Sequence, residues 1–279
     1  MATQMLIYES VAPISKQRHA KHSLEVGADY GFARNVNSLP LTAVEFLPAA
    51  LEYPVVFAGN DNSVMPAVIL GLRDKENTYL DARDNWRAKY IPAFARRYPF
   101  VFSSPDQGKN FALCIDESFT GLNTEDRGQR LFDDQGKPTQ YVENVLKFLQ
   151  QYQIEFQRTQ RFCDRLKKLG LLAPMQAQVD LGDSGRLSLT GFMVVDRAKL
   201  KALPGDTLAE LMKNDSLELI YGHLHSMRHF GAIRERMVGG KPEEVADTSP
   251  SPAVLAGEPA RKPAARTEKE AAGGKKRQT

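Results

Sequence analysis

The sequence of 279 residues contains only two cysteines, Cys114 and Cys163, and no apolar run long enough to cross a membrane. Two cysteines supply neither a disulfide framework nor the paired spacing of a zinc site. The longest apolar runs, such as AVILGL at 67–72, have the length of strands, whereas a spanning helix needs about 20 apolar residues. The chain starts without an apolar signal segment. We therefore expect a protein with no transmembrane segment in a reducing, cytoplasmic setting.

Neither basic nor acidic residues predominate in the sequence. The chain has 37 Lys and Arg against 34 Asp and Glu, a formal net charge of +3, and residues 241–279 hold eight of the basic and six of the acidic residues. A nucleic-acid-binding domain usually concentrates basic residues on its folded part, so we do not expect nucleic acid as a partner. Because the sequence lacks a phosphate loop, a nucleophile elbow and a complete calcium loop, we also expect no cofactor.

Composition divides the chain into two parts. The chain as a whole is 42% hydrophobic and 25% charged, the composition of an ordinary globular protein with a sizeable core. Residues 241–279 are instead rich in Pro, Ala, Gly and charged residues and contain no aromatic side chain. Such a segment buries too little apolar surface to offset the entropy of ordering. We predict one domain over residues 1–240 and a disordered tail over 241–279.

Within residues 1–240, the patterns of extended segments and helices predict an α+β fold rather than regular βαβ winding. Two apolar segments around a turn indicate a hairpin over residues 54–72, and the segment 78–81 is expected to add a third strand as a meander. Similar patterns predict a second hairpin over residues 100–116 and a third over 176–196.

The longest helical pattern runs from about Thr139 to Leu169. Apolar residues at steps of three and four predict one buried seam, made by Val142, Val145, Leu149, Tyr152, Phe156, Thr159, Cys163 and Leu166. Cys163 on this seam and Cys114 within a strand are interpreted as core residues. Shorter helices are expected at 42–53, 92–97, 196–203 and 207–214, and a closing helix at 217–237.

The segment Trp86–Phe102, WRAKYIPAFARRYPFVF, concentrates bulky rings beside Arg96 and Arg97. We interpret it as a structural corner where a hairpin, a short helix and the next strand pack. At least one of the two guanidinium groups should then face outward, near Asp81, Asp84 or the last helical carbonyls.

The alternative is an anion-binding pocket in this corner. The candidate ligand-binding residues are then Trp86, Tyr90, Arg96 and Arg97, in which rings provide stacking surfaces beside a bidentate donor. We favour the structural corner because a pocket needs convergent polar groups that the sequence does not locate.

Three histidines lie close together near the end of the domain, at His223, His225 and His229. His225 and His229 are four residues apart and would share a helical face, a spacing that can bind zinc or iron. His19 and His22 offer further nitrogens, but no glutamate completes a zincin motif and the third ligand is unspecified. We therefore favour structural or surface histidines and expect no metal.

Several segments occur in order across about residues 5–235: ADYGFARN, LTAVEF, EYPVVF, the Trp86–Phe102 segment, LFDDQGKPTQYV, LGLLAP and LTGFMVVD. Together they resemble the SapC family of bacterial proteins. The resemblance implies an association with surface-layer or surface-protein export, or with outer-membrane nutrient receptors, and it carries no established catalytic residues. A permease subunit shares the family's name, but a permease needs apolar membrane helices that this chain lacks.

The resemblance and the missing motifs together favour a non-enzymatic cytoplasmic accessory protein that recognises a protein partner in an envelope or export system. The alternative is a small-molecule or metal-dependent enzyme. It would use either the Trp86–Arg97 corner or the C-terminal histidines. A pocket that joins Trp86 to Arg97 would favour the enzyme, and a filled corner would favour the accessory protein.

Overall fold

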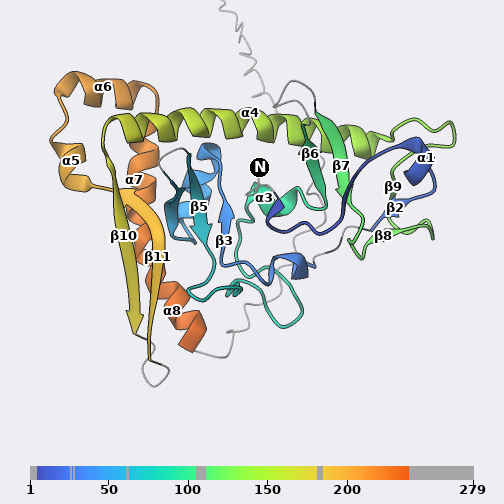
Figure 1. The fold of residues 1–279 in the computed structure, drawn as a ribbon, viewed down its shortest axis with the longest axis horizontal. Helices are drawn as coiled ribbons and strands as arrows, with labels where there is room; N and C mark the ends of the chain where they lie inside the picture. Colours follow the sequence, from blue (N-terminus) through green and yellow to red (C-terminus); the bar gives the residue numbers. More distant parts are fainter. Residues whose placement is uncertain are drawn as a thin grey trace, which may run out of the picture.

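The computed structural model describes residues 5–238 except 26, 28, 61–62, 105–110 and 181–184. Helices and antiparallel strands in several sheets confirm the predicted α+β class (Figure 1). The largest sheet has the strand order β10-β11-β4-β5-β3. These strands are β10 (Leu172–Asp180), β11 (Arg186–Val195), β4 (Val55–Gly59), β5 (Val64–Ile69) and β3 (Ser38–Pro40).

The first and third predicted hairpins form within this sheet. β4 pairs with β5 from Val55 opposite Val68 to Gly59 opposite Val64, and β10 pairs with β11. The predicted third strand at residues 78–81 is wrong, because Leu80 forms only an isolated bridge with Trp86. The place beside β5 is taken by β3.

Two smaller sheets complete the strand framework. One has the order β1-β7-β6, with β1 (Val11–Pro13), β7 (Ala112–Asp116) and β6 (Phe100–Ser103). Antiparallel pairing of β6 and β7 confirms the second hairpin, whose connection at 105–110 lies outside the described residues. The other has the order β8-β2-β9, with β8 (Leu122–Asn123), β2 (Ser23–Leu24) and β9 (Gln129–Arg130).

The long helix α4 (Gln140–Lys168) begins after Thr139 and ends at Leu169, as predicted. The predicted seam is buried except for Phe156, which is partly buried. Its first part, including Val142 and Leu149, packs in a hydrophobic cluster with the small sheets, and its second part packs in the cluster around the large sheet. The helix therefore joins both hydrophobic clusters along one side of the molecule (Figure 1).

The remaining helices are shorter than α4. They are α1 (Lys16–His19), η2 (Gly31–Ala33), η3 (Ala43–Glu45), α2 (Phe46–Ala50), α3 (Ala93–Arg96), α5 (Arg197–Lys201), α6 (Gly205–Lys213), α7 (Ser216–Ser226), η5 (Met227–His229) and α8 (Phe230–Val238). The predicted closing helix is thus divided by one turn of 3-10 helix, η5. Across the described ranges, no helix is both long enough and apolar enough to span a bilayer.

Both cysteines are core residues, as predicted. Cys114 lies buried in β7, and Cys163 lies buried on the α4 seam. Burial, with a smaller contribution from the neighbouring Asp164 carboxylate, raises the pKa of the Cys163 thiol to about 12. Because the thiolate is the reactive form, burial disfavours reactions of Cys163 at neutral pH.

Candidate functional site: the aromatic corner

The Trp86–Arg97 corner is built around the buried carboxylate of Glu45. Its Oε2 atom accepts hydrogen bonds from the Thr42 amide and hydroxyl at 2.9 and 2.8 Å, which makes a capping box at the start of η3. Its Oε1 atom accepts from the Tyr90 hydroxyl at 2.8 Å and the Ala93 amide at 2.7 Å. One carboxylate therefore fixes the segment before α3 against η3.

The polar ends of Trp86 and Tyr90 are both bound within the protein. The Trp86 indole N–H donates to the Tyr53 hydroxyl at 2.7 Å, and that hydroxyl donates to the Tyr90 carbonyl. The Tyr90 amide donates to Glu52 at 3.0 Å. Burial, followed by the Glu45 carboxylate, raises the pKa of Tyr90. These contacts are those of a packed corner, in which both rings hold the chain in place.

Arg97 points into the protein, with only 4% of its surface exposed. Its guanidinium carbon lies 4.2 Å from the centre of the Phe94 ring, 5.0 Å from Tyr152 on α4 and 5.6 Å from Tyr8. Rings at these distances stabilise a cation through their negative faces. Burial raises the pKa of Tyr8 to about 12, although Arg97 opposes this shift.

Arg96 is partly buried and does not reach the carboxylates expected from the sequence. Its Nε atom donates to the Ile91 carbonyl at 3.0 Å, and its guanidinium lies 5.5 Å from the Phe148 ring. The predicted contact of an outward arginine with Asp81 or Asp84 is therefore wrong.

Both carboxylates are bound by other groups of the protein. Arg34, which follows η2, donates its Nε to Asp84 at 2.7 Å. Asp81 accepts from the amides of Arg83 and Asn85, and these contacts contribute to a lowered pKa of Asp81 against the opposing effect of desolvation. Arg97, the residue that caps the four-residue helix α3, contacts Tyr152 on α4 instead.

Five partly exposed rings make an unbroken chain of ring contacts beside this corner, which we name the aromatic stripe: Phe119, Tyr98, Phe32, Tyr30 and Trp86. Phe32 and Tyr98 are stacked at 4.0 Å, and Phe119 meets Tyr98 edge-on at 5.5 Å. Tyr30 lies 5.8 Å from Phe32 and 5.5 Å from Trp86. The stripe thus connects the hydrophobic clusters of the large and small sheets.

Sequence reasoning nominated Trp86 and included Tyr98 in the corner segment, but it missed Tyr30, Phe32 and Phe119. Tyr30 and Phe32 stand two residues apart in ADYGFARN, and Phe119 follows β7. The available signal was the clustering of rings in segments that resemble one family, but the contacts between those segments depend on the tertiary fold.

Next to the end ring of the stripe, Tyr98 contacts Asp116, a buried carboxylate at the end of β7. The Tyr98 hydroxyl lies 3.4 Å from its Oδ2 atom, and its carboxylate accepts hydrogen bonds from the amides of Glu9, Ser10 and Ser118. Burial acts to raise the pKa of Asp116, but these hydrogen bonds together lower it below its ordinary value. The charged carboxylate therefore ties the N-terminal segment to the stripe.

The C-terminal histidines have separate roles. His223 is fully buried, and its Nε2 atom accepts from the Val195 amide at 3.0 Å while Nδ1–H donates to the Val55 carbonyl at 2.6 Å. Burial lowers the pKa of His223 to about 4. The neutral His223 side chain therefore joins α7 to β11 and β4 through two hydrogen bonds.

His225 and His229 are not brought together on a common ligand. His225 is exposed, whereas His229 donates from Nε2 to the Ala50 carbonyl at 2.9 Å. Near the other end of the chain, His19 contacts Glu117 through Nε2 at 3.1 Å and accepts from the Ser15 amide through Nδ1. Among the residues that the structure describes, no group of three or more His, Cys, Asp or Glu side chains is placed to hold a metal ion.

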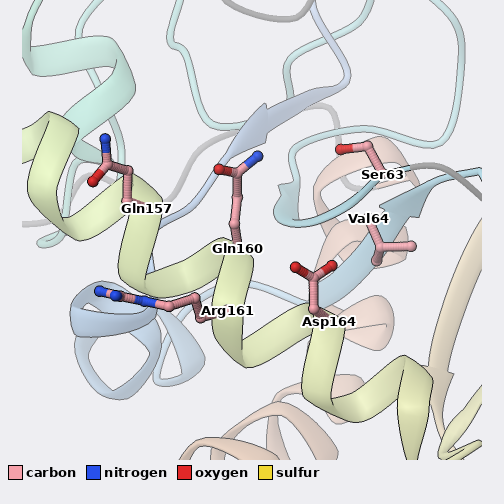
Figure 2. Close-up of a pocket in the computed structure, with 6 residues that line it drawn as sticks. All are labelled: Ser63, Val64, Gln157, Gln160, Arg161 and Asp164. Atoms are coloured by element: carbon pink, nitrogen blue, oxygen red, sulfur yellow. The ribbon is translucent and has the colours of Figure 1, made fainter. Parts of the chain in front are cut away.

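A surface depression lies away from the corner, between α4 and the start of β5. It is lined by Ser63, Val64, Gln157, Gln160, Arg161 and Asp164. Gln160 and Asp164 point toward β5, and Arg161 points the other way (Figure 2). The depression contains none of the ligand-binding residues nominated from the sequence.

The sequence profile of the SapC family matches residues 14–233, a span that includes the whole aromatic stripe and the corner. The chain belongs to the SapC family. No curated protein and no solved structure matches this SapC-family chain.

Proposed function

We propose that this SapC-family protein is a non-enzymatic accessory protein that acts in the cytoplasm for surface-layer or surface-protein export, or for envelope-linked nutrient uptake. It works by recognising a protein partner of that system, and the aromatic stripe is its recognition surface. Family membership supports the link to the envelope. The observation that carries the recognition role is the run of five adjoining, partly exposed rings from Phe119 to Trp86.

Aromatic side chains are enriched in the cores of protein interfaces, where they supply a large contact area at a small cost in conformational entropy. The rings of the stripe hold one another at 4.0–5.8 Å, and Asp116 and Tyr53 bind the polar ends of Tyr98 and Trp86. The surface is thus organised before a partner arrives, which reduces the entropic cost of binding.

The enzyme alternative has less support. It requires Trp86, Tyr90 and Arg97 to present their polar groups to a small molecule. Trp86 and Tyr90 instead donate to Tyr53 and Glu45, and Arg97 is buried among rings.

Site-specific photo-crosslinking in the native bacterium tests the proposal. A photoreactive phenylalanine analogue replaces Phe119, which is partly exposed at one end of the stripe, and a matched protein carries it at Met175, which is 41% exposed on β10. We expect Phe119 to capture one envelope or export protein that Met175 does not capture. The same captured proteins from both positions, or none from Phe119, would contradict the proposal.

A matched pair of variants gives an independent test in the same cells. Phe32→Ala removes the ring that stacks on Tyr98, and Phe111→Ala removes a ring that is 41% exposed on the hairpin of the small sheet, outside the stripe. We expect Phe32→Ala to reduce capture through Phe119 and Phe111→Ala to leave it unchanged, at equal amounts of folded protein.

A further inference from the structure

The outer side of η3 and α2 exposes aliphatic side chains to solvent. Val44, Leu47 and Leu51 are 65%, 45% and 69% exposed. Their spacing of three and four residues places them on one side of the helical segment, while Phe46 and Ala49 on the other side are buried. An exposed row of this kind marks an interaction surface more often than a single exposed leucine does.

This row continues onto α7. α2 packs along α7, and a Cβ atom at Gly222 would lie 3.4 Å from the Leu47 Cδ2 atom. The outer face of α7 carries three exposed side chains, Glu218, Tyr221 and His225, and Arg228 in η5 is also exposed. The backbone stays right-handed helical at Met227 and Phe230, so Arg228 in η5 continues the same face. We name these four residues and the aliphatic row the α2–α7 face.

The order of side chains along α7 is self-complementary in charge. Glu218 and Arg228 lie five residues before and after position 223, and Tyr221 and His225 lie two residues before and after it. When two such helices pack antiparallel, each Glu218 meets the Arg228 of the other copy, and each Tyr221 meets the other His225. Neither Glu218 nor Arg228 makes an ion pair with another described residue of its own chain.

We propose that the α2–α7 face binds a second copy of this chain in a two-fold symmetric dimer, with the two α7 helices antiparallel. A two-fold interface uses the same patch on both copies, and the charge order of α7 satisfies this condition. Gly222 lies where Leu47 of α2 packs on α7, so it brings the aliphatic row next to the outer face of α7. Leu47 and Leu51 then flank the helix pair and add apolar contacts to its charged ones.

The exposed apolar groups are few compared with a stable interface, which buries roughly 800 Å² on each partner. The dimer is therefore expected to be in concentration-dependent equilibrium with the monomer. Analytical ultracentrifugation of the full chain, over a wide range of protein concentrations and at low and high salt, measures its dissociation constant. We expect the dissociation constant to rise with salt because the rim pairs are screened.

A charge-reversal cycle tests the arrangement of the helices. Glu218→Arg and Arg228→Glu each place like charges together twice in the dimer, and each is expected to raise the dissociation constant by about tenfold or more. The double variant restores opposite charges and should return the constant close to that of the original protein. Lys147→Glu, an equal change of charge on the exposed side of α4, should leave it unchanged.

Leu51→Asp tests the apolar part of the face. Leu51 is 69% exposed in the monomer, so the substitution should abolish the dimer and leave the thermal midpoint of the monomer within a few degrees. A protein that stays monomeric at every concentration, a dimer that survives Leu51→Asp, or a double charge reversal that does not restore dimerisation would each overturn the proposal.

Discussion

The Tyr90 hydroxyl donates a hydrogen bond to the Glu45 carboxylate over 2.8 Å, and through it the segment before α3 is fixed to η3. Glu45 is almost fully buried and accepts three further hydrogen bonds, from Thr42 and Ala93. A carboxylate in such a position is stable only while its oxygens are satisfied. The corner is therefore held by polar contacts within its apolar packing.

Tyr90→Phe should destabilise the protein by about 1.5–3 kcal/mol, the range for a hydrogen bond to a charged group. The ring and its packing stay, so the loss reports the contact with Glu45. Denaturant titration gives the change in the free energy of unfolding. Tyr30→Phe is the matched control, because no described residue forms a hydrogen bond with the Tyr30 hydroxyl, and it should be nearly neutral. Equal effects of both variants would contradict the role of Glu45.

Phe94→Ala should cost about 3–5 kcal/mol, because Phe94 is 1% exposed and its removal leaves a cavity beneath Arg97. Trp86→Ala should cost less than Phe94→Ala, since Trp86 is partly exposed, although the variant also frees the Tyr53 hydroxyl. Thermal and denaturant unfolding of both variants measure this order. A nearly neutral Trp86→Ala would show that the ring does not support the corner and would reopen its role as a ligand surface.

Arg97→Ala should lower the free energy of unfolding by about 3 kcal/mol or more, among the largest effects of a single substitution in this segment. The variant removes a buried side chain from contact with Phe94, Tyr152 and Tyr8. The neighbouring Arg96→Ala should cost about 1 kcal/mol, the typical value for the lost hydrogen bond to Ile91. Denaturant titrations compare the unfolding midpoints of the two variants, provided that their slopes are equal. A larger loss of stability in Arg96→Ala than in Arg97→Ala would place the Arg97 side chain in solvent.

Much of the framework was predictable because it depends on local patterns. The helix from Thr139 to Leu169 repeats its apolar spacing over eight turns, so its limits and its buried seam follow from the sequence. The three hairpins follow from apolar segments around turns. The membership of Cys163 in the core follows from its place on the seam.

The remaining features depend on contacts between distant segments. Residues 78–81 have the composition of a strand, but the position beside β5 goes to β3, which precedes both in the sequence. Arg97 is charged and follows a short helix, so no local pattern reveals that Tyr8 and Tyr152 surround it. The stack of Phe32 on Tyr98 joins segments that are 66 residues apart.

Removal of residues 241–279 should leave the thermal midpoint unchanged within about a degree or two. The truncated segment lies beyond the family match, which ends at residue 233, and its composition offers little apolar surface to bury. Differential scanning calorimetry of the full and truncated chains makes the comparison. A loss of many degrees would show that the segment packs on the domain and that the predicted boundary at residue 240 is misplaced.

His223 should make stability fall as the pH drops. Its pKa is about 4 in the folded protein and about 6.5 in an unfolded chain, because the buried ring is held neutral between Val195 and Val55. Between these values the unfolded state binds more protons than the folded state, so the free energy of unfolding rises with pH. The contribution of the neutral His223 ring to the free energy of unfolding is complete above pH 6.5. It is lost as the pH falls toward 4, by an amount on the order of 3 kcal/mol.

Urea titrations at a series of pH values between 4 and 7 measure this slope. His223→Gln should lower stability at pH 7 and should also flatten the slope, because glutamine does not titrate. His225→Gln makes the same substitution at an exposed position of α7 and controls for the loss of a histidine that is not buried. His22 and His229, whose pKa values are lowered mainly by burial, add smaller contributions of the same sign, so some slope should remain in His223→Gln. An unchanged slope in His223→Gln would mean that the His223 ring is not held buried and neutral between α7, β11 and β4.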